Sequence, residues 1–279
     1  MGNGARFRRV TEPSAVSSKE SRLGPLGLLV FNLLYWPYLM TTIAILFPLV
    51  VMMRLVTFGN RRPTHALTSA WAAHYLTAAP FAGVRISGRE NVPQGACIFV
   101  SNHQSMVDVL AAYATRLPYL FVSKRENFWV PFLGWTMWVN GYVSLRRRHL
   151  PSIFKMLRRC EEHLKSGRNL YVFPEGTRSP DGQLIPFYRG AFWMSARYKV
   201  PIVPVVIEGT GQILPKRQLY ISPRPVTIRV LRPIEPSEAD FDSFRLRDLV
   251  HERMATELES VRAELVHATP GIVTGRHAA

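Results

Sequence analysis

The residues of this chain that could do chemistry begin with a histidine and an aspartate. His103 and Asp108 are separated by four residues and directly follow the apolar run 96–100. The length and β-rich composition of that run predict a buried strand, and the pattern after Ser105 predicts a helix. A histidine at the carboxyl end of a strand lies where open α/β sheets usually bind ligands. His103 is therefore a candidate general base, with Asp108 as the group that orients its ring.

The same residues also fit a structural interpretation. Ser105 and Asp108 match the S-x-x-D pattern of a capping box, in which their side chains would only stabilise the start of a helix. Taken alone, the pair does not decide between a catalytic role and a capping role.

A second group of functional residues follows the strand predicted at 170–173. Residues 175–178 are Glu-Gly-Thr-Arg, which combine a glycine that lets the backbone approach a ligand with an arginine suited to bidentate phosphate binding. Residues 179–182 are Ser-Pro-Asp-Gly, which favours an ordinary β-turn as the alternative. A turn does not require the four residues before it, however. The P-loop pattern G-x4-G-K-[ST] is absent.

A third group consists of cations on either side of an aromatic segment. Basic residues at 124–125 and 146–148 bracket a stretch that holds Trp129, Trp135 and Trp138, half of the six tryptophans in the chain. Tryptophan among apolar residues and beside cations is typical of a membrane interface. Burial of these rings in the core is the alternative, and both could hold for different rings.

Short β-type stretches alternate with helical patterns along the rest of the chain, which predicts an α/β fold. We expect a mixed, largely parallel central sheet flanked by helices. The expected strands are 84–87, 97–101, 119–123, 142–145, 170–173, 202–207 and 226–231, and the expected helices are 66–78, 105–115, 152–166, 189–199 and an amphipathic helix over 246–265.

The N-terminal part of the chain predicts a membrane-associated segment. Residues 24–53 contain no charged side chain, and this span exceeds the roughly 20 residues that a transmembrane helix needs. Pro37 and Pro48 interrupt it, so it predicts either one kinked spanning helix or two short helices in one leaflet. The expected division is a disordered tail at 1–23, a membrane anchor at 24–62, an α/β domain at 63–267 and a disordered tail at 268–279.

Charge and cysteine content narrow the partners and the compartment. The chain has 35 Lys and Arg against 19 Asp and Glu, a formal net charge of +16, which favours an anionic partner. We expect a phospholipid membrane rather than nucleic acid, because no nucleic-acid-binding motif is present. Cys97 and Cys160 are the only cysteines. Their apolar surroundings predict two core thiols and a domain that faces the cytoplasm.

Four patterns in this order resemble the glycerolipid acyltransferase family. They are Asn-His-x4-Asp at 102–108, the pattern from Lys124 to Arg147 (Lys-x-Glu, Pro-x-x-Gly, Gly-x5-Arg), Phe-Pro-Glu-Gly-Thr-Arg-Ser at 173–179 and Val-Pro-Ile-Val-Pro-Val at 200–205. The likeness covers about residues 84–210 and is greatest to 1-acylglycerol-3-phosphate acyltransferases, which make phosphatidic acid. This chain departs from the family pattern at Arg146, where the family often has Asp. It also departs within residues 187–190, where the family often has Lys.

The resemblance implies a role for each matching residue. The implied residues are His103 as the base, Asp108 as its partner and Lys124 at the reacting centre; Glu175, Gly176, Thr177, Arg178 and Arg147 at the phosphate of the acceptor; and Asn102, Pro201 and Pro204 as structural residues near the site. The capping geometry of Ser105 and Asp108 would then hold the helix start beside the histidine, so that the two interpretations are compatible.

The implied reaction moves a fatty acyl chain from acyl-CoA or acyl-carrier protein to the free hydroxyl of 1-acylglycerol 3-phosphate. Direct attack on the thioester needs no enzyme nucleophile, and no G-x-S-x-G pattern is present, which disfavours a lipid hydrolase. No metal or other cofactor is expected. The alternatives are another lysolipid acceptor, such as a lyso-ornithine lipid or lysophosphatidylglycerol, or a non-catalytic membrane-binding module. The sequence predicts no particular oligomeric state.

Overall fold

The computed structural model describes residues 24–77 and 83–267. The two tails that the sequence predicts to be disordered, 1–23 and 268–279, lie outside the described residues.

Within the described ranges the strands form one seven-stranded sheet in the order β1-β7-β6-β2-β5-β3-β4. Strands β2 to β6 run parallel to one another, while β6 and β7 pair antiparallel and β1 pairs parallel to β7. This confirms the mixed, largely parallel sheet. The strands are β1 (Val84–Ser87), β2 (Ile98–Ser101), β3 (Leu120–Lys124), β4 (Val143–Leu145), β5 (Leu170–Val172), β6 (Ile202–Glu208) and β7 (Val226–Val230).

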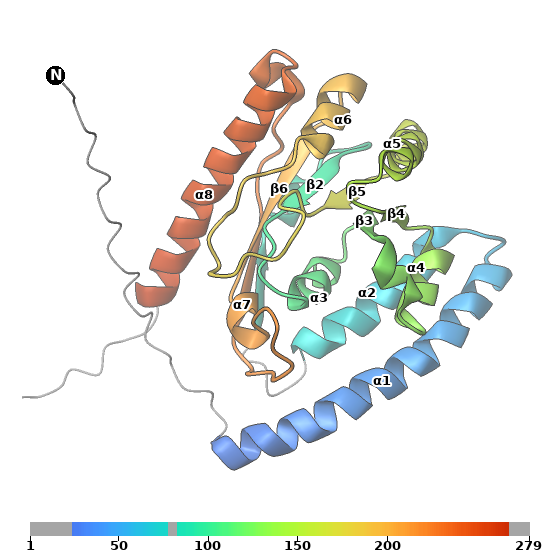
Figure 1. The fold of residues 1–279 in the computed structure, drawn as a ribbon, viewed down its shortest axis with the longest axis vertical. Helices are drawn as coiled ribbons and strands as arrows, with labels where there is room; N and C mark the ends of the chain where they lie inside the picture. Colours follow the sequence, from blue (N-terminus) through green and yellow to red (C-terminus); the bar gives the residue numbers. More distant parts are fainter. Residues whose placement is uncertain (1–23, 78–82, 268–279) are drawn as a thin grey trace, which may run out of the picture.

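Helices cover both faces of the sheet, as Figure 1 shows. Helices α5, α6 and α8 lie on one face, and α2 and α3 lie on the other, with α1 outermost. The helices are α1 (Pro25–Val56), α2 (Arg61–Thr77), α3 (Val107–Ala114), α4 (Leu133–Asn140), α5 (Leu150–Lys165), α6 (Gly190–Tyr198), α7 (Thr210–Ile213) and α8 (Ser243–His267), with 3₁₀ turns η1 (Arg89–Asn91), η2 (Arg125–Trp129) and η3 (Pro236–Ala239).

The central strands are apolar because both of their faces are covered. Every residue of β2 and β6 is buried, whereas β7 alternates buried and half-buried residues. Val100 of β2 lies between Val172 of β5 and Pro204 of β6. Since five neighbouring strands are parallel, their carboxyl ends meet at one edge of the sheet, and the loops that follow them can form one site.

The apolar segment near the N-terminus forms one continuous helix, α1, rather than two short ones. Pro37 and Pro48 lie inside it. This helix is long and apolar enough to cross a membrane by length and composition. It packs against α2 and α4 through one stripe, whose buried residues are Tyr35, Ile43, Leu46 and Val50. Its other side chains are largely exposed.

Other elements depart from the predictions in ways that local chemistry explains. Helix α2 begins at Arg61 rather than near residue 66, because the Asn60 side chain accepts the Arg62 N–H at 3.0 Å. Pro63 is tolerated in the first turn, where a missing N–H costs no helical hydrogen bond. Both cysteines are buried free thiols, as predicted.

The aromatic segment after β3 folds as η2 and α4, where the sequence pattern predicts no helix. Trp129, Trp135 and Trp138 are 71%, 44% and 69% exposed. The alternative prediction, that these rings are buried in the core, is therefore wrong. They lie on the surface beside α1.

Candidate active site

His103 occupies the loop that joins the carboxyl end of β2 to α3, and its ring is held by Asp108. The Nδ1 atom of His103 lies 2.8 Å from Oδ2 of Asp108. The imidazole also stacks on Phe173, which follows β5, with ring centroids 4.2 Å apart. The histidine side chain keeps 15% of its surface exposed, whereas the aspartate is fully buried. The predicted pair therefore has the geometry of an oriented general base.

The hydrogen bonds around Asp108 determine which ring nitrogen carries the proton. Its Oδ2 atom also accepts the backbone N–H groups of Gln104 at 2.6 Å and Ser105 at 2.8 Å, and the Thr210 hydroxyl bonds to Oδ1. A carboxylate that accepts this many bonds requires a donor from His103, so Nδ1 carries the hydrogen. In the neutral ring Nε2 is then the acceptor that faces a substrate.

The capping interpretation is partly correct as well. Asp108 lies in the first turn of α3 and accepts the Ser105 N–H, which is one half of a capping box. The Ser105 hydroxyl accepts the N–H of Val107 instead of that of Asp108, at 3.2 Å. One carboxylate thus both fixes the start of the helix and orients the imidazole.

Glu175 supports the histidine loop from the neighbouring strand. Its Oε1 atom accepts the backbone N–H of His103 at 2.8 Å, while Oε2 is buried and has no hydrogen-bond partner among the residues that the structure describes. Burial raises the pKa of this carboxyl from its ordinary value of 4.5 to about 8, against the lowering effect of backbone N–H groups. The side chain therefore points toward the base, although the resemblance implies a place for it at the phosphate.

A cationic corner forms where the loop after β5 meets the loop after α7. The side chain of Arg178 is half-buried and forms no ion pair within the described ranges. Nζ of Lys216 donates to the Arg178 carbonyl at 2.8 Å and lies 3.4 Å from the Thr177 hydroxyl. Lys216 was not a sequence candidate, because it lies 38 residues beyond Arg178 in an ordinary polar loop.

Gly176 is needed for close packing of this corner. Its φ of +66° lies in the left-handed region, and a Cβ there would come within 2.6 Å of the Tyr188 ring. Its N–H bonds to the Phe173 carbonyl at 3.1 Å. The glycine therefore lets the chain turn sharply from the strand and places Arg178 at the edge of the sheet.

The remaining predicted residues lie at different distances from this centre. Lys124 ends β3, beside β5, and pairs with Glu126 at 3.7 Å. Arg147 is exposed and follows the edge strand β4 at the same edge of the sheet. Pro204 is buried next to Val100 within the sheet. Pro201 precedes β6, so it lies at the opposite edge.

Two amide side chains fasten the loops around the histidine to β6. Asn102 exchanges hydrogen bonds with the backbone of Ile207 at 2.7 and 2.8 Å. Gln104 lies 3.3 Å from Glu208, whose carboxylate accepts a bond from Arg262 of α8 at 2.9 Å. Arg262 also donates to the Gly182 carbonyl at 2.7 Å. Helix α8 thus connects the end of β6 to the loop that carries the cationic corner.

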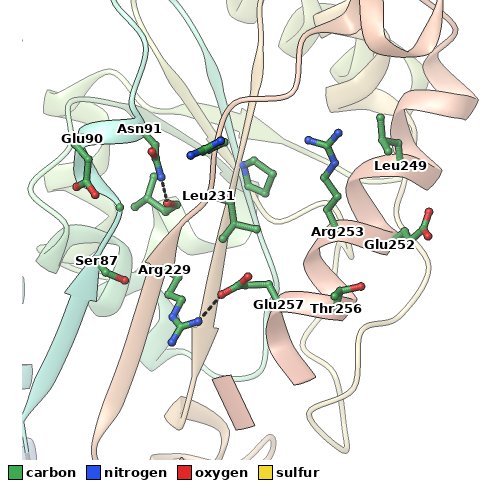
Figure 2. Close-up of a pocket in the computed structure, with 14 residues that line it drawn as sticks. Ser87, Glu90, Asn91, Arg229, Leu231, Leu249, Glu252, Arg253, Thr256 and Glu257 are labelled. Carbon is green, nitrogen blue, oxygen red and sulfur yellow. Dashed lines mark hydrogen bonds and ion pairs between the residues drawn. The ribbon is translucent and has the colours of Figure 1, made fainter. Parts of the chain in front are cut away.

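A well-formed pocket of about 740 Å³ elsewhere on the sheet has a different character. Figure 2 shows it between β1, β7 and α8. The pocket lies toward the amino ends of the parallel strands, whereas His103 follows the carboxyl end of β2. Arg229 there bonds to Glu257 at 2.6 Å, and Arg253 bonds to Glu238 at 2.8 Å. Two of the three arginines that line this pocket are thus paired with carboxylates, and the pocket lies at the other edge of the sheet, so we do not associate it with the chemistry of His103.

The side chains around His103 form no metal-ligand set. Among residues 24–77 and 83–267, no group of three or more His, Cys, Asp or Glu side chains is arranged to hold a metal ion. The chemistry that this arrangement itself supports is proton abstraction from a hydroxyl next to an anion-binding corner.

Comparisons with known proteins identify families and proteins that this chain is similar to. A family described as Acyltransferase matches residues 83–208. The chain is 37% identical to the chloroplast 1-acyl-sn-glycerol-3-phosphate acyltransferase of Brassica napus over 198 residues, which is 70% of this chain and 57% of that protein. It is 30% identical to the 1-acyl-sn-glycerol-3-phosphate acyltransferase of Salmonella typhimurium over 217 residues, which is 74% of this chain and 86% of that one.

A solved structure has the same fold. The 1-acyl-sn-glycerophosphate acyltransferase of Thermotoga maritima superposes with a TM-score of 0.72 at 25% sequence identity, covering 85% of this chain and 98% of that one. The chain thus matches the bacterial proteins over most of their length, whereas it spans less than two thirds of the relatives from Brassica napus, Chlamydomonas reinhardtii and Arabidopsis thaliana.

Proposed function

This chain belongs to the glycerolipid acyltransferase family, and from that membership we propose that it is a 1-acylglycerol-3-phosphate acyltransferase. It transfers a fatty acyl chain from acyl-CoA or acyl-carrier protein to the free hydroxyl of 1-acylglycerol 3-phosphate and so produces phosphatidic acid. The observation that carries the proposal is the oriented His103–Asp108 pair beside Arg178, in a chain related to proteins named for this reaction.

The proposed mechanism uses the imidazole as a general base. Nε2 of His103 removes the hydroxyl proton while the oxygen attacks the thioester carbonyl, and Asp108 stabilises the resulting imidazolium. The tetrahedral intermediate collapses with cleavage of the carbon–sulfur bond, and the proton passes from Nε2 to the departing thiolate. The new ester bond is then complete. Lys124 or backbone N–H groups near it would stabilise the oxyanion.

The phosphate of the acceptor provides the orientation. Arg178 and Lys216 offer guanidinium and ammonium donors beside the base, and an arginine binds phosphate through two parallel hydrogen bonds. Arg147, which follows β4, is the further cation that the family resemblance implies. Holding the phosphate fixes the hydroxyl next to Nε2, which converts an encounter in solution into a reaction within one complex.

A lysolipid panel tests the proposal. Purified full-length chain in detergent is incubated with labelled acyl-CoA and, in separate reactions, with lysophosphatidic acid, lysophosphatidylglycerol or a lyso-ornithine lipid. We expect labelled phosphatidic acid as the main product. Preferential acylation of another lysolipid would correct the acceptor, and transfer to none of them, from either acyl-CoA or acyl-carrier protein, would support a non-catalytic module.

Removal of the base tests the mechanism separately. We expect His103→Ala to lower kcat by about 10²- to 10⁴-fold, which is the usual contribution of a general base. The melting temperature should change little, because the ring is partly exposed. Phe154→Ala on α5 serves as a control, since it removes an exposed ring far from the site in sequence. Activity of His103→Ala near the unsubstituted level would exclude the general-base role.

A further inference from the structure

A second cavity extends along the edge strand β4, between α4, α5 and the junction of α1 with α2. It encloses about 1220 Å³ and is lined by the exposed rings of Trp129, Trp135 and Trp138. Among the described residues that line it, Glu162 is the only acidic one. The basic residues that line this groove are Arg61, Arg125, Lys155, Arg159 and Arg168.

These cations lack carboxylate partners among the described residues. In the part of the chain that the structure describes, none of the five lies within ion-pair distance of a carboxylate. Glu162 itself is paired with Arg158, at 3.4 Å. The Nε atom of Arg61 is buried and has no hydrogen-bond partner within residues 24–77 and 83–267. Buried donors of this kind are rare unless a ligand or water completes them.

The cations are close enough to repel one another. The pKa of His163 is lowered to about 4 by burial and then by the charges of Arg168, Arg61 and Arg159. Burial also lowers the pKa of the Arg61 guanidinium, with further lowering by Arg54, Arg168 and Arg159. An anion bound among these guanidinium groups would remove that repulsion.

The groove is separate from the site around His103. Gly141 and Arg168 precede β4 and β5, so this end of the groove lies at the amino edge of the parallel strands. A Cβ at Gly141 would lie 2.5 Å from Nε of Arg61, so the glycine makes room for the guanidinium. The other end reaches Arg125, which directly follows β3 at the edge that holds His103.

We propose that this groove binds a phosphate-bearing ligand, with its phosphate groups held by Arg61, Arg159 and Arg168. Two sources carry that chemistry. One is the nucleotide end of coenzyme A, with its diphosphate and 3′-phosphate, and this source rests on the proposed function. One end of the groove lies at the sheet edge that holds His103. The groove would therefore accommodate the nucleotide end of acyl-CoA at a distance from the thioester. The other source is the headgroup of an anionic phospholipid beside α1.

The first experiment measures binding in the absence of any acyl acceptor. Full-length chain in neutral detergent is titrated with coenzyme A and with dephospho-coenzyme A, which lacks only the 3′-phosphate. Arg159→Gln with Arg168→Gln removes two exposed, unpaired cations. Arg158→Gln is the control. It removes one positive charge from the position next to Arg159 on α5, and that position does not line the groove. Flotation with phosphatidylglycerol vesicles, against phosphatidylcholine vesicles, tests the lipid source.

We expect the double variant to weaken one of these interactions by about tenfold or more, as loss of charge-assisted bonds to phosphate usually does. The control should stay within about twofold of the unsubstituted chain. If coenzyme A is the ligand, it should also raise the melting temperature of the unsubstituted chain but not of the double variant. Loss of selectivity for phosphatidylglycerol alone would identify the lipid headgroup.

The proposal is overturned if the double variant binds coenzyme A and phosphatidylglycerol vesicles as well as the control does. The same preparations are assayed for acylation of lysophosphatidic acid, which keeps the two proposals apart. If the double variant shows unchanged binding and normal acylation, the proposed phosphate site in the groove is rejected, while the proposed function stands. Groove-dependent binding by an unsubstituted chain that acylates no lysolipid would reject the proposed function alone.

Discussion

At the scale of single residues, His103 is fixed from three directions by groups that come from two segments, α3 and the loop after β5. Asp108 of α3 holds Nδ1, Glu175 after β5 holds the backbone N–H, and Phe173 stacks on the ring. Each contact fixes a different property of His103. The first fixes the tautomer of the ring, the second the position of the backbone and the third the plane of the ring. A base held in this way loses little entropy when the acceptor hydroxyl arrives.

The raised pKa of Glu175 gives a prediction about stability and pH. Its pKa is about 8 in the folded chain against an ordinary value of 4.5. Between these values the unfolded chain has released the proton and the folded chain has kept it, so the free energy of unfolding falls as the pH rises. Glu175→Gln removes this loss and keeps an oxygen that can accept the His103 N–H.

We therefore expect Glu175→Gln to match the unsubstituted chain in melting temperature near pH 4.5. The variant should become progressively more stable relative to it up to about pH 8, with a constant difference above that. Thermal melts at several pH values measure the difference. Glu259→Gln, which alters an exposed carboxyl on α8, is the control. A difference that stays constant from pH 5 to pH 8 would contradict the raised pKa.

The cationic corner predicts a selective effect on acceptor binding. We expect Arg178→Ala to raise the KM for lysophosphatidic acid by about 10- to 100-fold and to leave the KM for the acyl donor nearly unchanged, because only the acceptor phosphate faces this side chain. Lys216→Ala should act in the same direction more weakly. Arg85→Ala, on the distant edge strand β1, controls for loss of positive charge. Equal changes in the KM values for acceptor and donor would contradict the role of Arg178 in binding the acceptor phosphate.

At the scale of elements, helix α1 is fastened to the loop that carries Lys216. The Asn32 side chain donates to the Ile221 carbonyl at 2.9 Å and accepts the Ile221 N–H at 2.7 Å. Trp36, one turn further along, donates to the Leu219 carbonyl at 3.0 Å. The apolar helix thus holds the loop from outside, and the same loop reaches the Arg178 carbonyl from inside.

This connection predicts that Asn32→Leu acts on the site without touching it. We expect the substitution to release the loop and to raise the KM for lysophosphatidic acid severalfold, with kcat for bound substrate and the KM for the donor less affected. Asn32→Asp keeps the acceptor for the Ile221 N–H and should have a smaller effect. Steady-state kinetics with each substrate varied in turn measure both. Identical kinetics for Asn32→Leu and the unsubstituted chain would show that the loop holds its position without α1.

The elements differ in how far sequence predicts them, and the reason is physical. The predicted strands agree with the observed ones to within a residue at almost every end, because short apolar runs between polar loops suit only a covered sheet. Helix α4 was missed since Trp135 and Trp138 give it apolar side chains on its exposed side, which obscures the helical period. Helix α2 was shortened because Pro63 suggested a turn.

The site shows the same division. Spacing alone predicted the contact between His103 and Asp108, since the two residues lie five positions apart on either side of the start of α3. By contrast, the bond from Glu175 to the His103 N–H and the approach of Lys216 to Arg178 depend on which strands are neighbours. Strand order is a long-range property, so residues joined across it have no local signal in the sequence.

At the scale of the whole molecule, the charge and the apolar surface lie together on the side of α1. This helix presents one stripe to α2 and α4, and its other residues face outward. The groove with its unpaired arginines opens beside the carboxyl end of the same helix. An apolar helix flanked by cations and exposed tryptophans suits the surface of an anionic membrane. The length and composition of α1 would also allow it to cross a membrane.

The outward face of α1 therefore carries the final prediction. Leu33 and Leu34 are 65% and 66% exposed on α1, and burying a leucine in an apolar phase stabilises by roughly 1.5–3 kcal/mol. We expect Leu33→Glu with Leu34→Glu to reduce partitioning of the full-length chain into phospholipid vesicles by more than about tenfold, without lowering its melting temperature in detergent. Phe154→Glu, on α5 and 67% exposed, should leave partitioning nearly unchanged. If the double variant floats with vesicles as the unsubstituted chain does, the surface formed by α4 and the groove, rather than α1, must supply the membrane contact.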